Sequence, residues 1–190
     1  MINDKHHRRS IRLKGYDYSQ PGAYFVTMCV ACRECLLGDI GEGVMRLSPY
    51  GAIVQECWYE LPRHFADVEL DTFVAMPNHV HGMVVLRPVG AGFKPAPTKH
   101  HPLSEIVRGF KTFSARRINE HRGTPGIPVW QRNYYERVIR NEGELDRIRE
   151  YVANNPMRWP MDRENPDHVG AGFKPAPTDD IDAIFGGVGL

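Results

Sequence analysis

Apolar and polar positions recur along the chain with the two periods that distinguish strands from helices. Runs rich in β-branched and aromatic residues predict strands over residues 23–31, 67–76, 79–86 and 134–139. Apolar residues at helical spacing predict helices over residues 48–64, 103–121 and 142–154. Ser48 should cap the first of these helices. The last should end at Asn155, because a residue before proline is biased out of the helical region.

The order of these elements predicts the fold class. The first six run strand, helix, strand, strand, helix, strand, which is the order of the ferredoxin-like split βαβ unit. We therefore predict an α+β fold, with one antiparallel sheet, helices on one of its faces and an added C-terminal helix. Within 190 residues we expect a basic N-terminal arm over 1–20, a single domain over 21–160 and a mobile Pro/Gly-rich tail over 161–190.

One decapeptide, Val-Gly-Ala-Gly-Phe-Lys-Pro-Ala-Pro-Thr, occurs at 89–98 and again without change at 169–178. Two glycines and two prolines make it a poor former of helix or strand, so we predict an inserted loop at 89–98 and a second copy in the tail. One allowed choice of codons for Val-Gly-Ala-Gly-Phe has a reverse complement that encodes Lys-Pro-Ala-Pro. A translated palindromic DNA element would explain both copies, and a duplicated linker is the alternative.

Composition excludes membrane-spanning and secreted classes. No stretch approaches the roughly 20 apolar residues of a transmembrane helix. The first 20 residues hold five Lys or Arg with no apolar run behind them, unlike a signal peptide. These features predict a cytoplasmic protein without membrane contact.

Three of the four cysteines have the spacing of a metal or cluster site. Cys29, Cys32 and Cys35 follow a C-x2-C-x2-C pattern, and Cys57 stands apart. However, Cys29 falls in a predicted strand and no compact fourth ligand follows. Reduced structural thiols are therefore favoured over a metal site.

Charge is uneven along the chain although the net formal charge is only +1. Residues 99–140 hold nine Lys or Arg against three Asp or Glu, whereas residues 41–76 hold two against six. Clustered basic charge favours binding to a polyanion, because neutralised phosphates release their counterions. A solvated helix face is the alternative explanation.

Two pairs of residues can carry chemistry. His79 and His81 lie two apart on a predicted strand, so their imidazoles share a face and suit one divalent metal, although such pairs also occur as plain surface residues. Tyr151 and Asn155 lie four apart on the last helix and are therefore neighbours. A phenol can be a nucleophile and an amide oxygen can bind a metal. The alternative is a core tyrosine and a helix-ending asparagine.

Taken together, the motifs over residues 73–85, 129–140 and 151–156 resemble the single-tyrosine HUH transposases. The asparagine four residues after the tyrosine, followed by proline, is most similar to the REP-associated tyrosine transposases. The resemblance covers about residues 10–160. It implies that His79, His81 and Asn155 bind Mg²⁺ or Mn²⁺, and that Tyr151 on a catalytic C-terminal helix attacks a DNA phosphate to form a 5′-phosphotyrosine.

The resemblance also implies a partner, which is single-stranded DNA folded into hairpins. It would make the protein a DNA nuclease and strand transferase, more often a monomer than a dimer, and nucleoid-associated when bound to DNA. Basic and aromatic side chains are candidates for DNA contact: Arg108, Lys111, Arg116, Arg117, Trp130, Arg132, Arg137 and Arg140. Tyr134 and Tyr135 are rival nucleophiles, but neither has the asparagine partner of Tyr151.

Three other functions are compatible with parts of the pattern. One is a nucleic-acid-binding module on the same fold that has lost catalysis, against which the intact set of four residues argues. Another is an HUH relaxase or replication initiator, for which the chain is short. The third is a metal-dependent hydrolase of small substrates, for which the sequence shows no pocket signal.

Overall fold

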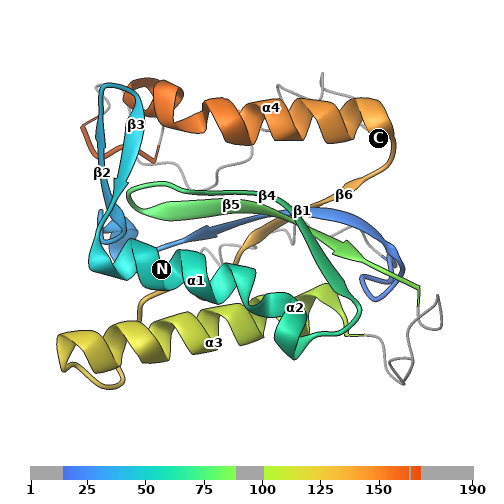
Figure 1. Cartoon of the computed structure of the whole chain (residues 1–190), viewed down its shortest axis with the longest axis horizontal. Coiled ribbons are helices and arrows are strands. Elements are labelled where there is room, and N and C mark those ends of the chain that lie inside the picture. The colour runs from blue at the N-terminus through green and yellow to red at the C-terminus, as the bar shows by residue number, and fades with distance from the viewer. Residues whose placement is uncertain (1–14, 89–100, 163, 168–190) are drawn as a thin grey trace, which may run out of the picture.

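The computed structural model describes residues 15–88, 101–162 and 164–167 (Figure 1). Most of the predicted N-terminal arm and both copies of the decapeptide lie outside the described residues. The strands are β1 (Gly22–Cys29), β2 (Gly38–Gly41), β3 (Val44–Leu47), β4 (Val68–Ala75), β5 (His79–Leu86) and β6 (Tyr135–Ile139). The α-helices are α1 (Pro49–Tyr59), α2 (Leu61–His64), α3 (Leu103–Arg122) and α4 (Glu142–Arg158), and short 3-10 turns cover Ala31–Arg33 and Trp159–Met161.

The main sheet has the predicted topology. Its strand order is β4-β5-β1-β6, and every neighbouring pair is antiparallel. Strand β5 therefore lies between β4 and β1, which is the split βαβ arrangement. The predicted α+β fold with a ferredoxin-like antiparallel sheet is confirmed.

The alternation of side chains along β1 gives the sheet two buried faces. Tyr24, Val26 and Met28 belong to the larger core, which also contains buried residues of α1 and α3. Phe25 belongs to a second core that includes Ile148 and Val152 of α4. In Figure 1, α1, α2 and α3 accordingly lie on one side of the sheet and the added helix α4 lies on the other.

Two helix boundaries differ from the prediction. The segment expected as one helix over residues 48–64 is split at Glu60 into α1 and α2, with Pro62 in the first turn of α2. Helix α4 does not end at Asn155 but continues through Pro156 to Arg158. The backbone N–H of Trp159 donates to the carbonyl of Pro156, and this bond at the C-cap closes the last turn.

The hairpin of β2 and β3 was not predicted. Its two-residue turn, Glu42-Gly43, has φ of 55° and 74°, as hairpin turns with a right-handed twist require. A Cβ placed on Gly43 would lie 3.3 Å from Cγ of Met157, so the turn packs closely on the end of α4. The hairpin therefore supports the helix that carries Tyr151. None of the helices in the described part of the chain combines the length and apolarity needed to cross a bilayer.

Candidate active site

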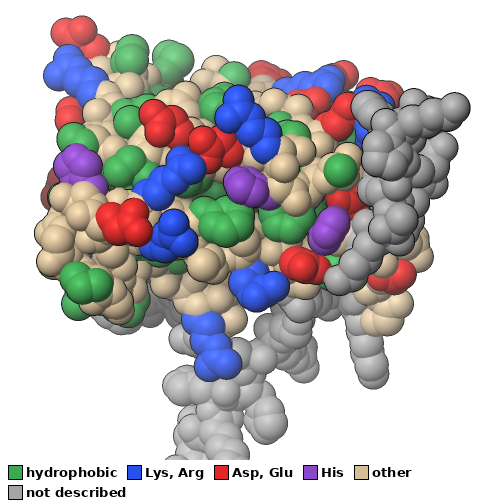
Figure 2. All heavy atoms as spheres, turned by 60° about the horizontal axis from the view of Figure 1, so that its bottom comes forward, with side chains coloured by type: hydrophobic (Ala, Val, Ile, Leu, Met, Phe, Trp, Pro, Cys, Tyr) green, Lys and Arg blue, Asp and Glu red, His purple; other side chains and the backbone are tan. Residues whose placement is uncertain are grey.

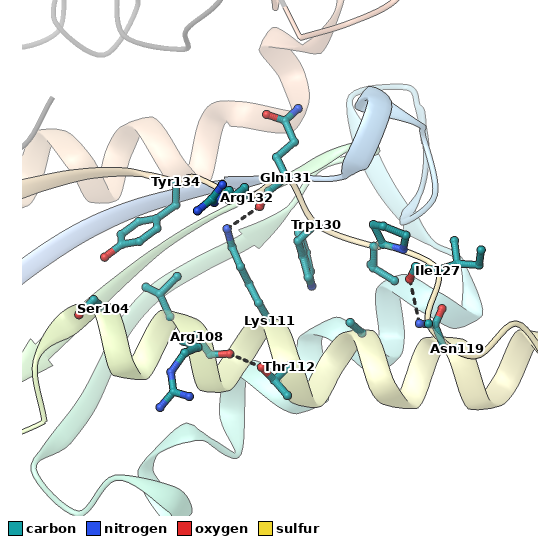
Figure 3. A pocket seen from close by; sticks show the side chains of 15 residues that line it. Ser104, Arg108, Lys111, Thr112, Asn119, Ile127, Trp130, Gln131, Arg132 and Tyr134 are labelled. Carbon is teal, nitrogen blue, oxygen red and sulfur yellow. Dashed lines mark hydrogen bonds between the residues drawn. The ribbon is translucent and has the colours of Figure 1, made fainter. Parts of the chain in front are cut away.

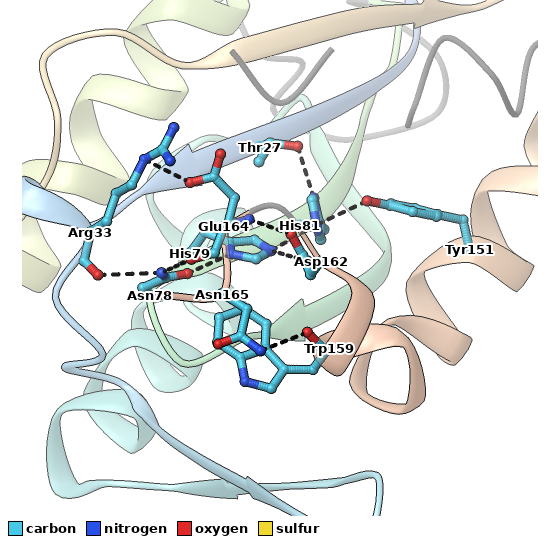
Figure 4. Close-up of polar contacts among 10 residues, drawn as sticks. All are labelled: Thr27, Arg33, Asn78, His79, His81, Tyr151, Trp159, Asp162, Glu164 and Asn165. Atoms are coloured by element: carbon cyan, nitrogen blue, oxygen red, sulfur yellow. Dashed lines mark hydrogen bonds and ion pairs between the residues drawn. The ribbon is translucent and has the colours of Figure 1, made fainter. Parts of the chain in front are cut away.

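His79 and His81 point from β5 towards the α4 side of the sheet. Gly82, the next residue, faces the opposite side, where a Cβ would lie 2.4 Å from Cζ2 of Trp58. The two imidazoles are almost completely buried, with 1% and 2% exposure. Their Nε2 atoms lie 3.0 Å apart, so the two rings are directed at one common point (Figure 4).

Asn78 fixes the orientation of His79. Its amide nitrogen donates to the backbone carbonyls of Glu164 at 2.6 Å and Arg33 at 3.3 Å. Its Oδ1 therefore faces Nδ1 of His79, at 2.8 Å, and can only accept a hydrogen bond. The proton of neutral His79 is consequently on Nδ1, and the lone pair on Nε2 points towards His81.

Thr27 has the corresponding role for His81. It is the cross-strand partner of His81 on β1, and its Oγ1 lies 2.8 Å from Nδ1 of that histidine. A hydroxyl can accept the Nδ1 proton, which leaves a second lone pair on Nε2. Such outer partners are typical of metal-binding histidines, where they set the tautomer and the ring orientation.

Tyr151 reaches this point from α4. Its hydroxyl lies 3.4 Å from Nε2 of His81, at the outer limit of a hydrogen bond, and its ring packs edge-on against Phe25. Asn155 lies one turn further along the same helix and is 2% exposed. The Oδ1 atom of Asn155 has no hydrogen-bond partner among the described residues. The structure thus places Tyr151 at the histidine pair, and the Oδ1 of Asn155 is free of hydrogen bonds within the described ranges of the chain.

The chain that follows α4 also packs on the histidine pair. Oδ2 of Asp162 lies 3.8 Å from Nε2 of His79, and the ring of Trp159 lies 6.1 Å from the His79 ring. Glu164 is buried and forms an ion pair with Arg33 at 3.0 Å. These residues belong to the end of the predicted domain and the start of the predicted tail, and the sequence pattern gave no signal for them.

Electrostatics keep both histidines neutral. Burial lowers the pKa of His79 to about 3, and the nearby positive charge of Arg33 lowers it further. Burial also lowers the pKa of His81, with a contribution from His79. Neutral imidazole is the form that binds a metal.

The donor set fits a divalent cation. The two Nε2 atoms lie 3.0 Å apart, an arrangement that a shared proton stabilises or, when both rings carry their proton on Nδ1, a shared cation. In the described residues no three His, Cys, Asp or Glu side chains group as a metal site, so the unpaired oxygen of Asn155 is the candidate third ligand. Imidazole and amide-oxygen ligands are both acceptable to Mn²⁺, and oxygen ligands are preferred by Mg²⁺.

The cysteines are free thiols. Cys29 and Cys57 are buried, whereas Cys32 and Cys35 are exposed. Burial raises the pKa of Cys29 to about 12, which keeps this thiol protonated. These observations agree with reduced structural cysteines.

The predicted DNA-contact residues fall into different places. Arg108, Lys111 and Arg132 line one groove beside α3. Arg116, Arg117 and Arg137 form ion pairs with Glu120, Glu60 and Glu144, respectively, and the backbone N–H of Arg140 donates to Glu144. Figure 2, which brings the lower side of Figure 1 forward, shows Lys and Arg side chains interspersed with Asp and Glu. That face is therefore not uniformly basic.

Trp130 is largely buried, unlike an exposed stacking residue. Only 8% of it is exposed, its indole N–H donates to Oγ of Ser114 at 2.9 Å, and its ring packs on Phe110. The ring of Trp130 completes the core under α3 and also lines the groove that holds Arg108 and Arg132 (Figure 3), so its contact with DNA stays a prediction.

The rival tyrosines have other surroundings. Tyr135 is 5% exposed and packs against Phe25, and Tyr134 lies on the α3 side of the sheet beneath the ammonium group of Lys111. Tyr151 contacts His81 of the histidine pair through both its hydroxyl and its ring.

A buried H-x-H pair on a split βαβ sheet, with a tyrosine and an asparagine on the helix that crosses it, matches the class expected from the sequence. The chain belongs to the IS200-like transposase family, whose model matches residues 54–155. It is 41% identical over 172 residues to an uncharacterized protein of Haemophilus influenzae. The alignment covers 83% of this chain and 93% of that protein.

The fold is also similar to a solved structure of a REP-associated tyrosine transposase bound to a REP hairpin. The TM-score is 0.54 over 77% of this chain and 73% of the other, at 20% sequence identity. At that identity the likeness concerns the fold. The family membership gives this chain a transposase-like role in DNA transposition.

Proposed function

We propose that this transposase is a metal-dependent endonuclease and strand transferase for single-stranded DNA, and that Tyr151 is its nucleophile. The observation that carries the proposal is the position of the Tyr151 hydroxyl, 3.4 Å from Nε2 of His81 at the point where two neutral imidazoles meet. A phenol placed beside a cation site is arranged for attack on a phosphate held there.

The residues of the site divide the work of this reaction. His79, His81 and Asn155 would hold Mg²⁺ or Mn²⁺, which supplies charge stabilisation at the scissile phosphate. Asn78 and Thr27 would accept the Nδ1 protons of the two rings and so leave both Nε2 lone pairs for the metal. Packing of Tyr151 against Phe25 restricts the ring, so that its oxygen remains at the site.

The reaction conserves a phosphodiester-level bond. The phenol oxygen of Tyr151 forms a bond to phosphorus, and the bond from phosphorus to the 3′ oxygen of the preceding nucleotide breaks. The proton lost by the phenol balances the one gained by the 3′-hydroxyl. Attack of a 3′-hydroxyl on the 5′-phosphotyrosine then rejoins a strand and restores the phenol, so no nucleotide triphosphate is required.

The proposed substrate is single-stranded DNA that carries a hairpin. The structural relative was solved with a REP hairpin, and one allowed choice of codons for the decapeptide at 89–98 forms an inverted repeat. We propose that the protein acts as a monomer on such hairpins. Mass measurement in solution, with and without the hairpin, tests this part.

The test is covalent capture. A labelled strand with the inverted repeat and its genomic flanks is incubated with the protein and Mn²⁺ or Mg²⁺, and is then resolved on a denaturing gel. The wild-type protein and Tyr134→Phe should form a metal-dependent covalent band, and Tyr151→Phe should not. Tyr134→Phe is the matched control because it removes the same hydroxyl from another tyrosine.

Two results would reject the proposal. One is a covalent band that persists in Tyr151→Phe. The other is tight hairpin binding by the wild-type protein without a covalent band in either metal, which would favour a silent binding module.

A further inference from the structure

The side-chain amide of Asn78 lies between the ring of His79 and two backbone carbonyls (Figure 4). Its nitrogen donates to the carbonyls of Arg33 and Glu164, while its Oδ1 faces Nδ1 of His79. A flipped amide would place Oδ1 against these two carbonyl oxygens, neither of which can donate a hydrogen bond. The two carbonyls therefore determine which end of the Asn78 amide faces His79.

The two residues that supply these carbonyls are joined to each other by their side chains. Nε of Arg33 lies 3.0 Å from Oε2 of Glu164. Arg33 follows β1 and Glu164 follows α4, so the ion pair joins segments from opposite ends of the described chain. The Glu164 side chain is only 6% exposed, and solvent ions screen such a pair much less than an exposed one. Asn78, Arg33 and Glu164 thus form a closed ring of contacts.

Arg33 belongs to a turn with an uncommon backbone conformation. Cys32 and Arg33 have φ of 55° and 57°, so two successive residues that are not glycine lie in the left-handed region. Such a conformation persists where the surrounding structure holds it. In this turn the Arg33 carbonyl reaches Asn78 while its guanidinium reaches Glu164, and both contacts hold the turn in place.

The chain after α4 is ordered by its own hydrogen bonds. We call residues 159–162 and 164–165 the closing segment. The backbone N–H of Asp162 donates to the carbonyl of Trp159, and that of Asn165 donates to the carbonyl of Asp162. The Asn165 side chain also donates to the carbonyl of Trp159, at 3.1 Å. Because these bonds make the segment one unit, the ion pair of Glu164 anchors the whole segment beside Asn78.

The position of the proton on His79 depends on this arrangement, because a negative charge lies near the other ring nitrogen. Oδ2 of Asp162 is 3.8 Å from Nε2 of His79. A neutral imidazole has one proton, on Nδ1 or on Nε2. The charge of Asp162 favours the proton on Nε2, whereas Oδ1 of Asn78 favours it on Nδ1. Only the second tautomer leaves the Nε2 lone pair for a metal.

We propose that Arg33 and Glu164 are positioning residues of the metal site, which hold the amide of Asn78 in the orientation that keeps the proton of His79 on Nδ1. Their effect reaches the metal through Asn78 and His79. Loss of such an outer partner typically weakens metal binding about 10–100-fold. The inference rests on the proposed function, because the metal is part of that proposal.

The experiment measures the tautomer of His79 and the affinity for Mn²⁺ separately. Metal-free, full-length protein with isotopically labelled histidine is studied by proton–nitrogen correlation NMR, in which protonated and unprotonated ring nitrogens have different nitrogen shifts. The His79 signals are assigned by their absence from the spectrum of His79→Gln. Mn²⁺ affinity is measured by titration with electron paramagnetic resonance detection. The wild-type protein should show the proton of His79 on Nδ1.

Two variants break the ion pair from either side. Glu164→Ala removes the anchor of the closing segment but keeps the backbone carbonyl. We expect the fraction of His79 with its proton on Nδ1 to fall to about one tenth and Mn²⁺ to bind about tenfold more weakly. The two changes should agree, because the apparent dissociation constant rises in inverse proportion to the competent fraction. Arg33→Ala should have the same effect, and the double variant should lose no more affinity than either single variant.

Two further variants separate positioning from a general loss of structure. Glu164→Gln keeps an oxygen that can accept from Arg33 and should retain the Mn²⁺ affinity within about threefold. Glu60→Ala is the matched control, because it breaks an ion pair with Arg117, which is 41% exposed against 40% for Arg33. That pair lies on the side of the sheet opposite α4 (Figure 1), so the His79 tautomer and the Mn²⁺ affinity should not change. Circular dichroism melts check that each variant is folded.

Three results would overturn the proposal. One is an unchanged tautomer of His79 in both Glu164→Ala and Arg33→Ala. Another is weaker Mn²⁺ binding without a change of tautomer, which would give the ion pair a structural role only. The third is tighter Mn²⁺ binding in either variant, which would make the closing segment a competitor of the metal.

The two readouts also separate this proposal from the proposed function. If the wild-type protein binds no Mn²⁺ while the tautomer responds to both variants as expected, the metal-dependent function fails and the positioning role of the ion pair stands. If the wild-type protein binds Mn²⁺ and the tautomer responds to neither variant, the positioning role fails and the proposed function stands.

Discussion

Replacing Thr27 with valine removes one hydroxyl from the active site and leaves its shape nearly unchanged. Thr27 is 1% exposed, and its Oγ1 lies within hydrogen-bond distance of Nδ1 of His81, at 2.8 Å. Valine is β-branched like threonine and suits a strand, so β1 should keep its pairing. The buried Nδ1 of His81 would lose its hydrogen-bond partner, and the tautomer that leaves a lone pair on Nε2 for a metal would lose its support.

The size of the effect follows from that single contact. A buried ring nitrogen without a hydrogen-bond partner lowers the free energy of unfolding by about 1–3 kcal/mol. The better strand propensity of valine offsets part of this loss. We expect the free energy of unfolding to fall by about 1–2 kcal/mol, equivalent to about 2–8 °C in the midpoint of a domain of this size. Loss of an outer-shell partner should weaken Mn²⁺ binding about 10–100-fold.

The assay is an Mn²⁺ titration followed by electron paramagnetic resonance, with thermal unfolding of the metal-free protein measured in parallel. Thr27→Ser is the matched control, because it keeps the hydroxyl and removes only a methyl group. It should retain Mn²⁺ affinity within a few-fold while losing stability of about 1 kcal/mol. If Thr27→Val binds Mn²⁺ as tightly as the wild type, or if Thr27→Ser is as weak as Thr27→Val, the assigned tautomer of His81 is wrong.

Three further changes test other parts of the structure. Gly82→Ala places a Cβ 2.4 Å from Trp58 and should destabilise the fold by about 1–3 kcal/mol in chemical unfolding, and an unchanged midpoint would contradict the packing of α1 on β5. Asn155→Leu removes a buried oxygen that has no hydrogen-bond partner among the described residues, so the metal-free protein should melt at the same or a higher temperature while Mn²⁺ binding is lost. A large drop in melting temperature would show that the protein itself donates a hydrogen bond to this oxygen. Burial lowers the pKa of Lys111 to about 8, with the buried thiol of Cys29 as an opposing influence, so the groove loses a positive charge as the pH rises through that value. The affinity for a single-stranded oligothymidylate should therefore fall between about pH 7 and pH 9 in the parent protein but not in Lys111→Arg, whose charge persists. Equal pH profiles would show that the Lys111 charge does not contribute to DNA binding.

Local sequence patterns were sufficient where a short period determines which way a side chain faces. The two-residue spacing of His79 and His81 placed both rings on one face of β5, and the four-residue spacing of Tyr151 and Asn155 placed both on one face of α4. The order of elements then fixed the topology of the sheet. These features depend on neighbours in the chain, so they are visible without knowledge of the fold.

The missing features depend on contacts between distant segments. Thr27 meets His81 because of the register between β1 and β5, and the Glu164 carbonyl meets Asn78 across 86 residues of chain. Burial of Trp130 depends on the position of Ser114 on α3. An aromatic residue in a basic segment suggests either a stacking surface or a core, and only the packing of α3 decides between them.

The central claim is that Tyr151 forms the covalent bond to DNA, and mass spectrometry of the captured adduct tests it most directly. After cleavage in Mn²⁺, the DNA is trimmed with nucleases, the protein is digested, and the modified peptide is sequenced by tandem fragmentation. The account predicts a nucleotide attached through its 5′ phosphate to Tyr151. A nucleotide on Tyr134, on Tyr135 or on any other residue would contradict it.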